Sequence, residues 1–228
     1  MIVNELVGNT NIKAKYFVSL GLLARYDFDS NILLNSLSNL ADLSGNGNHA
    51  TIINGNSNYF KPDGSMEFGN SQRVNTINQS FFNGVGGSVA SVLRYNTRNH
   101  TAGVIADVSN TSVVRLMFGY VNTPPLNFFN GFYATKHFQS SGTHYPDGYF
   151  HLCMTYDRSS IKVYVNGALI QNNAAGAFTV NNTVIHVGGA IGGAVFNGNI
   201  KNMMFYDRAL SQDEVSQNQN EYERLEFL

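Results

Sequence analysis

The stretch YFHLCMTYDRSSIKVYVNGALI, residues 149–170, decides the fold class of this chain. Apolar side chains alternate with polar ones over 152–156 and again over 161–165, with a polar turn at 157–160 between them. A period of two is the pattern of a strand that buries one face. The pair Asn166-Gly167 then favours a type I′ hairpin turn, because both central residues of that turn need a positive φ. The stretch predicts a meander of three antiparallel strands.

Similar short alternating segments lie on both sides of this meander. They are Leu22 to Phe28, Ser88 to Tyr95, Val113 to Tyr120, Val184 to Gly188 and Asn199 to Tyr206. Gly and Asn residues separate them, and the glycine-rich run 188–198 is expected to reverse the chain and pack tightly. Many short strands with such turn signals are typical of an all-β sandwich or barrel.

The end of the chain changes from strand to helix periodicity. Ser211 and Glu214 form the S-x-x-E pattern of a capping box, with Leu210 and Val215 placed for a hydrophobic staple. Val215, Tyr222 and Leu225 then recur at helical spacing, which predicts a helix over 211–225. Its apolar stripe is narrow, so we expect the helix to lie across an edge of the sandwich or against a neighbouring subunit.

Composition limits the classes of function. The chain has 228 residues, which is enough for one sizeable core. Its formal net charge of −1 argues against a nucleic-acid binder, which would need a basic face. Cys153 is the only cysteine, so no intramolecular disulfide can form, and its strand position predicts a buried, inert thiol. The frequent Asn residues suit neutral sugars, or a surface that assembles with other copies of the chain as a homo-oligomer.

No targeting or membrane segment is expected. The apolar run Tyr16 to Ala24 is too short to span a bilayer, and no small-residue cleavage site follows it. Because the chain begins with Met1, we expect it to be complete, soluble and not exported by a signal peptide.

The loop DLSGNGNHA, residues 42–50, contains the letters of a dinucleotide-binding fingerprint. That fingerprint needs a helix directly after the glycines, whereas β-branched residues and an Asn-Gly turn follow here, which excludes it. Two interpretations stay open. Asp42, Ser44 and Asn46 alternate as in the first half of a calcium loop, or they form a turn in which their side chains bond to nearby backbone.

Four stretches together resemble the laminin-G-like, concanavalin A-like lectin/glucanase jelly rolls. They are GLLARYDFDSN (21–31), DLSGNGNHAT (42–51), GYFHLCMTYDRSSIKVYVNGALI (148–170) and IHVGGAIGGAVFNGNIKNMMFYDRALSQDEV (185–215). The resemblance implies a two-sheet antiparallel jelly-roll sandwich over 21–228, closed by the helix, and often a calcium ion. Residues 1–20 precede it as an arm or an edge strand. The family's tryptophan in the meander is replaced here by Phe150, since the chain has no Trp.

The acidic residues argue against an enzyme. Glycoside hydrolysis needs two carboxyl groups, about 5–5.5 Å or about 6.5–9.5 Å apart, yet no Glu lies between Glu67 and Glu214. The acids in that interval, ahead of the helix, all have turn or strand positions: Asp107, Asp147, Asp157 and Asp207. No pair of histidines has zinc-ligand spacing, and no G-x-S-x-G motif occurs. The sequence predicts a non-enzymatic binding or structural module.

A ligand site is expected within 119–149, a segment rich in aromatic, His and turn residues. The candidate glycan-binding residues are Tyr133, His137, His144 and Tyr145, because aromatic faces stack on sugars while polar groups satisfy hydroxyls. The phenylalanines of this segment are expected in the core or a subunit interface. A set of exposed aromatics could equally form a protein–protein patch.

The segment RALSQDEVSQNQNEYERLEFL, residues 208–228, is similar to the closing helix of jelly-roll proteins among tailed-phage virion proteins. This resemblance implies a virion surface component, such as a decoration, fibre or tail protein. Its partners would be other virion proteins and a cell-surface polysaccharide. Virion proteins leave the cell by lysis, which agrees with the missing export signal. The alternatives are a free bacterial carbohydrate-binding lectin, extracellular or cytoplasmic, and a glycoside hydrolase.

Overall fold

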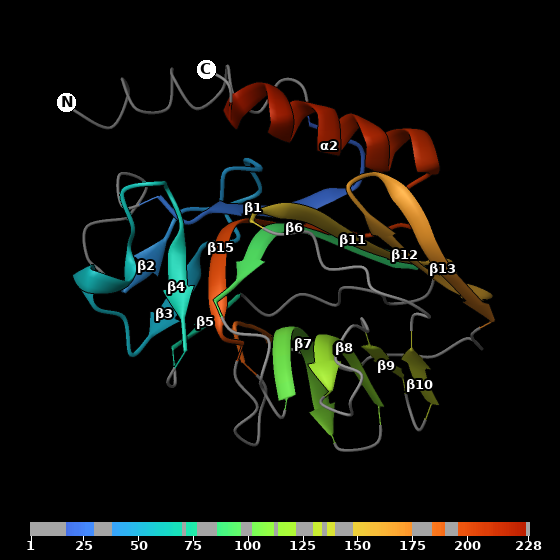
Figure 1. Ribbon diagram of the computed structural model, residues 1–228, viewed down its shortest axis with the longest axis horizontal. Helices are drawn as coiled ribbons and strands as arrows, with labels where there is room; N and C mark the ends of the chain where they lie inside the picture. Colours follow the sequence, from blue (N-terminus) through green and yellow to red (C-terminus); the bar gives the residue numbers. More distant parts are fainter. Residues whose placement is uncertain are drawn as a thin grey trace.

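The structure is a computed structural model. It describes residues 17–29, 38–69, 72–76, 86–96, 102–111, 114–121, 130–133, 136–139, 148–174, 184–189 and 196–226, with the backbone alone for 102–139 and 225–226. In this part of the chain, strands form two antiparallel sheets that face each other, and a single long helix lies outside one of them (Figure 1). The expected two-sheet antiparallel sandwich with a C-terminal helix is confirmed.

The first sheet, sheet A, has the strand order β1-β15-β6-β11-β12-β13, and β4 pairs with β15 beside it. Its strands are β1 (Leu22–Asp27), β4 (Met66–Phe68), β6 (Gly87–Tyr95), β11 (Phe150–Tyr156), β12 (Ser160–Val165), β13 (Ala168–Ala174) and β15 (Gly198–Tyr206). The predicted meander is β11-β12-β13, and Asn166 and Gly167 have φ of 47° and 74°, as a type I′ turn requires.

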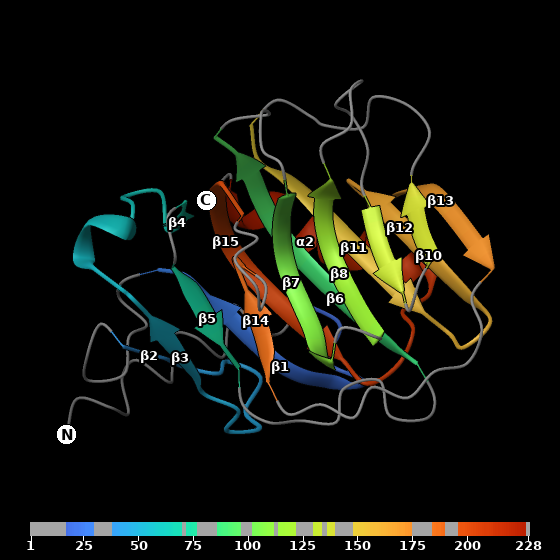
Figure 2. The ribbon, with the colours of Figure 1, turned by 90° about the horizontal axis from the view of Figure 1, so that it is seen from below.

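The second sheet, sheet B, has the order β10-β9-β8-β7-β14-β5-β3-β2 and lies in front of sheet A in Figure 2. Its strands are β2 (Asn39–Leu40), β3 (Ala50–Ile53), β5 (Arg73–Asn75), β7 (Ala102–Thr111), β8 (Val114–Val121), β9 (Asn130–Tyr133), β10 (Lys136–Gln139) and β14 (Ile185–Val187). A short 3₁₀ turn, η2 (Ser57–Tyr59), lies between β3 and β4.

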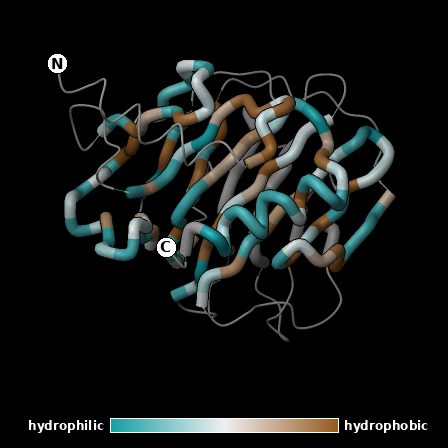
Figure 3. Tube along the Cα trace, turned by 90° about the horizontal axis from the view of Figure 1, so that it is seen from above, coloured by the Kyte–Doolittle hydropathy of each residue, from teal (hydrophilic) through white to brown (hydrophobic). Residues whose placement is uncertain are grey.

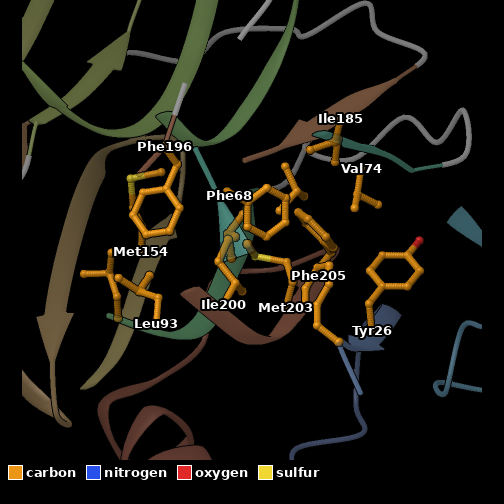
Figure 4. Packing of buried hydrophobic residues seen from close by; sticks show 14 of the residues in the cluster. Tyr26, Phe68, Val74, Leu93, Met154, Ile185, Phe196, Ile200, Met203 and Phe205 are labelled. Atoms are coloured by element: carbon orange, nitrogen blue, oxygen red, sulfur yellow. The ribbon is translucent and has the colours of Figure 1, made fainter. Parts of the chain in front are cut away.

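The main core lies between the sheets. Figure 4 shows Val74 and Ile185 of sheet B meeting Phe68, Met203 and Phe205 of sheet A. Phe150 is buried in this core and stacks on Tyr95 with ring centroids 6.1 Å apart. Gly188 permits the close approach of β14 to this core, because a Cβ there would lie 2.0 Å from the Phe68 ring.

The helix α2 (Gln212–Glu226) lies on the outer face of sheet A, where Val215 joins a second buried cluster with Cys153, Tyr164 and Met204. Figure 3 shows it crossing that face with mostly hydrophilic residues. We expected an edge position, and the structure corrects this. The buried side of α2 is partly polar: Asn218 is fully buried and bonds to the Val18 amide and the Tyr206 hydroxyl. Hydropathy alone therefore underestimates how much of the helix is covered.

Other expectations hold at the level of single contacts. Cys153 is buried, and Ser211 and Glu214 exchange the two bonds of a capping box. The arm or edge strand expected at 1–20 lies mostly outside the described residues; Phe17 and Val18 pack into the second cluster. No helix among the residues with a described backbone has the length and apolar character needed to cross a membrane.

Candidate functional site

The loop 42–49 is built around the Asp42 carboxylate. Its Oδ1 accepts hydrogen bonds from the amides of Arg25 (3.0 Å) and Ser44 (2.9 Å). Its Oδ2 accepts from the Ser44 hydroxyl (2.8 Å) and from the Asn48 amide (2.9 Å). Since Arg25 belongs to β1, the carboxylate ties the loop to sheet A. The strand β3, and not a helix, follows the loop.

The other two residues of the predicted calcium set also bond to the polypeptide. The Asn46 side-chain amide donates to the carbonyls of Leu22 (2.8 Å) and Leu23 (3.2 Å), and the Ser44 hydroxyl lies 3.3 Å from the Leu23 carbonyl. This arrangement fits the hydrogen-bonded turn and does not fit a cation-ligand set, because N–H and O–H donors surround both carboxylate oxygens. The described residues also contain no cluster of three or more His, Cys, Asp or Glu able to hold a metal ion. Calcium binding stays a prediction, tested below with Asp42→Ala.

Two of the four predicted glycan-binding residues, Tyr133 and His137, fall on sheet B. Tyr133 ends β9 and pairs with Lys136, and His137 of β10 pairs with Phe132, so the two occupy adjacent rungs of one hairpin at the sheet edge. His144 and Tyr145 lie outside the described residues. The role of all four stays a prediction.

A group of polar side chains that the sequence did not reveal lies on the outer face of sheet A. We call it the Tyr149 patch, and its members are Asp63, Ser65, Arg94, Tyr149, Asn199 and Lys201. The members Arg94, Tyr149 and Asn199 directly neighbour Leu93, Phe150 and Ile200, three strand residues that are buried in the main core. Because successive side chains of a strand point to opposite faces, Arg94, Tyr149 and Asn199 point outward.

The Tyr149 ring is the centre of the patch. Its hydroxyl donates to Asp63 Oδ2 at 2.7 Å, and the Arg94 and Lys201 cations lie 4.9 Å and 4.5 Å from the ring centroid. Both distances are within the range of cation–π attraction. Arg94 and Asp63 are 4.0 Å apart, with 41% and 37% of their side chains exposed. The patch is therefore open to solvent.

Hydrogen bonds bias the protonation of the patch. Burial raises the pKa of Tyr149 to about 12, and the bond to Asp63 adds to this effect. Burial alone would raise the pKa of Asp63, but bonds from Ser65 and Tyr149 and the charge of Lys201 outweigh it and hold that pKa below its usual value. At neutral pH the patch thus contains a neutral phenol and an ionised carboxylate.

Among the described residues, the carboxyl groups with shifted pKa values are all more acidic than usual. The pKa of Asp157 falls to about 2 because bonds from Ser159 and Ser160 outweigh the effect of burial. That of Glu214 also falls to about 2, mainly through its bonds with Arg208. A general acid of glycoside hydrolysis needs a raised pKa, and the pKa values of Asp63, Asp157 and Glu214 are all lowered.

Sequence reasoning missed the Tyr149 patch because its members come from distant segments. Tyr149 lies at the start of the meander, four residues beyond the predicted Tyr145. The available signal was the strand alternation, which places Tyr149 on the face opposite Phe150. Its partners at 63, 94 and 201 meet it only through the pairing of β15 with β4 and β6, and of β6 with β11.

A family model described as the concanavalin A-like lectin/glucanases superfamily, Laminin_G_3, matches residues 68–216, well over half of the chain. The chain belongs to this superfamily. The matched range of this concanavalin A-like chain begins after the loop 42–49 and covers the strands from β5 to β15 and the start of α2. No curated protein sequence matches the chain.

Solved structures share the fold at low sequence identity. Domain 4 of AbnA, an extracellular GH43 arabinanase from Geobacillus stearothermophilus solved with arabinotriose, is 18% identical with a TM-score of 0.65, over 87% of this chain and 98% of that one. Trypanosoma rangeli sialidase, solved with sialic acid, is 12% identical with a TM-score of 0.71, over 97% of this concanavalin A-like chain. The chain spans 39% of that sialidase's length.

A third similar structure belongs to botulinum neurotoxin type C, whose cell entry depends on interaction with two ganglioside molecules. It is 14% identical with a TM-score of 0.66, over 93% of this chain and 52% of that one. At these identities the likeness shows the concanavalin A-like fold alone.

Proposed function

We propose that this chain is a non-enzymatic module that binds a glycan and is displayed on the surface of a tailed-phage virion, as a decoration, fibre or tail protein. The observation that carries the binding role is the Tyr149 patch. It offers a half-buried aromatic ring, two cations and a carboxylate on an open face, beside the buried amide of Asn199. Such mixed groups can pair with sugar hydroxyls, and an aromatic ring can contact the apolar face of a sugar.

Two further observations support the proposal. The arabinanase domain solved with arabinotriose has the same fold over 98% of its length, so a separate module of this size can carry a sugar. The similarity of 208–228 to the closing helix of tailed-phage virion proteins supports display on a virion. The residues Tyr133, His137, His144 and Tyr145 stay candidates for the same role, and the first two of them belong to the hairpin at the edge of sheet B.

A glycan array tests the binding role. The full chain is labelled and applied to neutral and acidic glycans, beside Tyr149→Ala and Tyr133→Ala variants. We expect the chain to bind a subset of the array, and each variant to show which surface is used. Binding to no glycan would contradict the proposal, and release of reducing sugars from a bound polysaccharide would revive the hydrolase alternative. Mass spectrometry of purified phage particles tests the display, because a free bacterial lectin would not co-purify with them.

A further inference from the structure

The helix α2 covers the outer face of sheet A through a contact that is largely polar. Within the described part of the chain, Val215 is the only residue of α2 in the second buried cluster. The other buried side chains of the helix are those of Asn218, Gln219, Glu221 and Tyr222, of which only the last is largely apolar. Apolar burial supplies most of the free energy that holds packed elements together, so α2 is held less firmly than the strands that share the main core.

His151 lies in this contact. Cys153, two residues further along β11, belongs to the second cluster, and alternate residues of a strand share one face of the sheet. The His151 amide donates to the Asn166 side chain at 2.9 Å, and the next residue, Gly167, lies beneath the helix, since a Cβ there would be 3.8 Å from Gln219 Cβ. The helix, which also contacts β11 itself, therefore closes over the imidazole.

Three buried polar atoms in the contact have no hydrogen-bond partner. They are both ring nitrogens of the fully buried His151 and Gln219 Oε1, although the Gln219 amide nitrogen donates to Glu223 at 2.7 Å. A neutral imidazole already carries one N–H, which Gln219 Oε1 does not accept, so that oxygen offers no acceptor to a protonated ring either while the helix is docked. A second proton would thus add a buried charge without an acceptor, which costs far more free energy than a neutral polar group.

No charge of a described residue offsets this cost. The titratable and charged groups on the outer face of β6, β11 and β12 and on α2 are Arg94, Cys153, Lys162, Tyr164, Asp213, Glu214, Glu221, Tyr222, Glu223 and Arg224. Of the acids, Glu214 is held by Arg208 and Glu221 by Arg224. Burial lowers the pKa of His151 to about 4, against 6.5 in an exposed imidazole, and no charged group among the described residues contributes to this shift. The docked helix therefore favours the neutral ring.

We propose that α2 is an acid-released cover: protonation of His151 detaches the helix from sheet A while the sandwich stays folded. The open form takes up the proton more readily, because the imidazole then reaches water. Release exposes the outer face of sheet A that carries Cys153, Tyr164 and Met204, a surface that is buried at neutral pH. The inference goes beyond the proposed function and does not depend on it, since it uses neither the Tyr149 ring nor the edge of sheet B.

Cys153 reports the release, because it is the only cysteine and is buried in the cluster that α2 covers. The full chain is labelled with 4,4′-dithiodipyridine, a reagent that reacts with thiols in acid as well as at neutral pH. The labelling rate, divided by the rate for the urea-unfolded chain at the same pH, gives the open fraction. We expect this ratio to rise about 25-fold from pH 7.5 to pH 5, as the two pKa values of His151 require.

Two variants change the helix contact in different ways. His151→Leu should abolish the rise and keep Cys153 protected, because a neutral side chain remains at every pH. Asn218→Ala should raise the ratio about tenfold at each pH and keep the rise, because the fully buried Asn218 bonds to the Val18 amide and the Tyr206 hydroxyl.

A matched control moves the thiol to the opposite face of the same sheet. The double variant Cys153→Ala, Val163→Cys places the thiol in the main core, on the strand beside Cys153. This thiol should react only through global unfolding, with a ratio at least about tenfold below that of Cys153. Low concentrations of urea make the same distinction in the natural sequence. They should barely change the ratio for Cys153, because release of a helix exposes little surface, whereas global unfolding depends steeply on urea.

The outcomes decide the proposal. A Cys153 ratio that stays constant from pH 7.5 to pH 5 overturns it. Equal ratios for the Cys153 and Val163→Cys thiols, or a steep urea dependence for Cys153, also overturn it, because the helix would then open only with the whole fold. A rise that persists in His151→Leu overturns the role of His151. If His151→Leu does not fold, the pH profile and the urea dependence of Cys153 labelling still decide. None of these results bears on glycan binding, so the two proposals fail separately.

Discussion

At the scale of single residues, Asp42 shows how one carboxylate can organise a loop. It accepts four hydrogen bonds, two of them from the amides of the buried residues Arg25 and Asn48. The loop also needs its glycines, because Gly45 and Gly47 have φ of 90° and 76°, values that glycine adopts without steric cost. The backbone geometry of the loop thus explains why its glycines match the pattern of a dinucleotide-binding fingerprint.

We expect Asp42→Ala to lower the free energy of unfolding by about 3 kcal/mol, because two buried amides lose their acceptor. Urea denaturation of both proteins measures this. Asp157→Ala is the control: that carboxylate accepts similar bonds, but in an exposed turn, so its loss should cost about 1 kcal/mol or less. Measuring in calcium and in EDTA also tests the ion. A wild-type stability that rises with calcium, and a variant that does not respond, would establish a calcium site instead.

At the scale of elements, α2 is fixed at its start by a side-chain network. The Glu214 carboxylate accepts from the Ser211 amide at 2.9 Å and from two nitrogens of Arg208 at 2.6 Å and 2.8 Å. Arg208 in turn donates to the Leu20 carbonyl, which connects the helix to the segment that precedes β1. The network around the capping box therefore also fixes the position of the segment that leads into β1 of sheet A.

We expect Glu214→Ala to lower the free energy of unfolding by about 1–2 kcal/mol at pH 7, through the lost cap and ion pair. Since the folded pKa of Glu214 is about 2, against its usual 4.5, this difference is complete above pH 4.5 and disappears as the pH falls toward 2. Urea denaturation at several pH values checks both points. Asp213→Ala, an exposed acid in the same turn, should change stability by a few tenths of a kcal/mol. Equal losses for the two variants would contradict the capping role.

Some elements could be predicted from the sequence and others could not, for physical reasons. The strands β1, β6, β8, β11, β12, β13, β14 and β15 were expected within a few residues, because one buried face gives a clear alternation or the turns beside them are marked. The strands β2, β3, β4, β5, β9 and β10 were missed, since with two to four residues each they are too short for a period to show, and the ten-residue β7 was missed as well. The Tyr149 patch was missed because register, and not local pattern, brings Asp63, Arg94 and Lys201 to Tyr149.

At the scale of the whole molecule, a fully buried histidine should make the stability of the fold depend on pH. His151 of β11 is fully buried on the outer face of sheet A, where α2 contacts β11, and neither ring nitrogen has a partner among the described residues. Burial lowers its pKa to about 4. The folded protein therefore holds a neutral imidazole, whereas the unfolded chain gains a proton at about pH 6.5.

We expect the free energy of unfolding to be highest above pH 6.5 and to fall by up to about 3 kcal/mol as the pH drops from 6.5 to 4, because the unfolded state binds the proton first. Urea denaturation across this range measures the slope. His151→Leu should remove it, and His49→Gln, which changes an exposed histidine, should keep it. A His151→Leu protein that keeps the slope would assign it to other groups. The acids Asp157 and Glu214 act below pH 4.5, so they leave the slope between pH 6.5 and 4.5 unchanged.

The position of the two ends of the described chain has a mechanical consequence. Val18 and Asn218 are hydrogen-bonded at 2.9 Å, and Leu22 pairs with Tyr206 at the first rung between β1 and β15. A force that pulls these two ends apart first acts on the bonds of Val18 with Asn218 and of Leu20 with Arg208, and then on the rungs between β1 and β15 one after another. Shear across all rungs at once does not arise. We therefore expect the sandwich to open at lower tension when it is stretched through these ends than when a load shears β1 along β15.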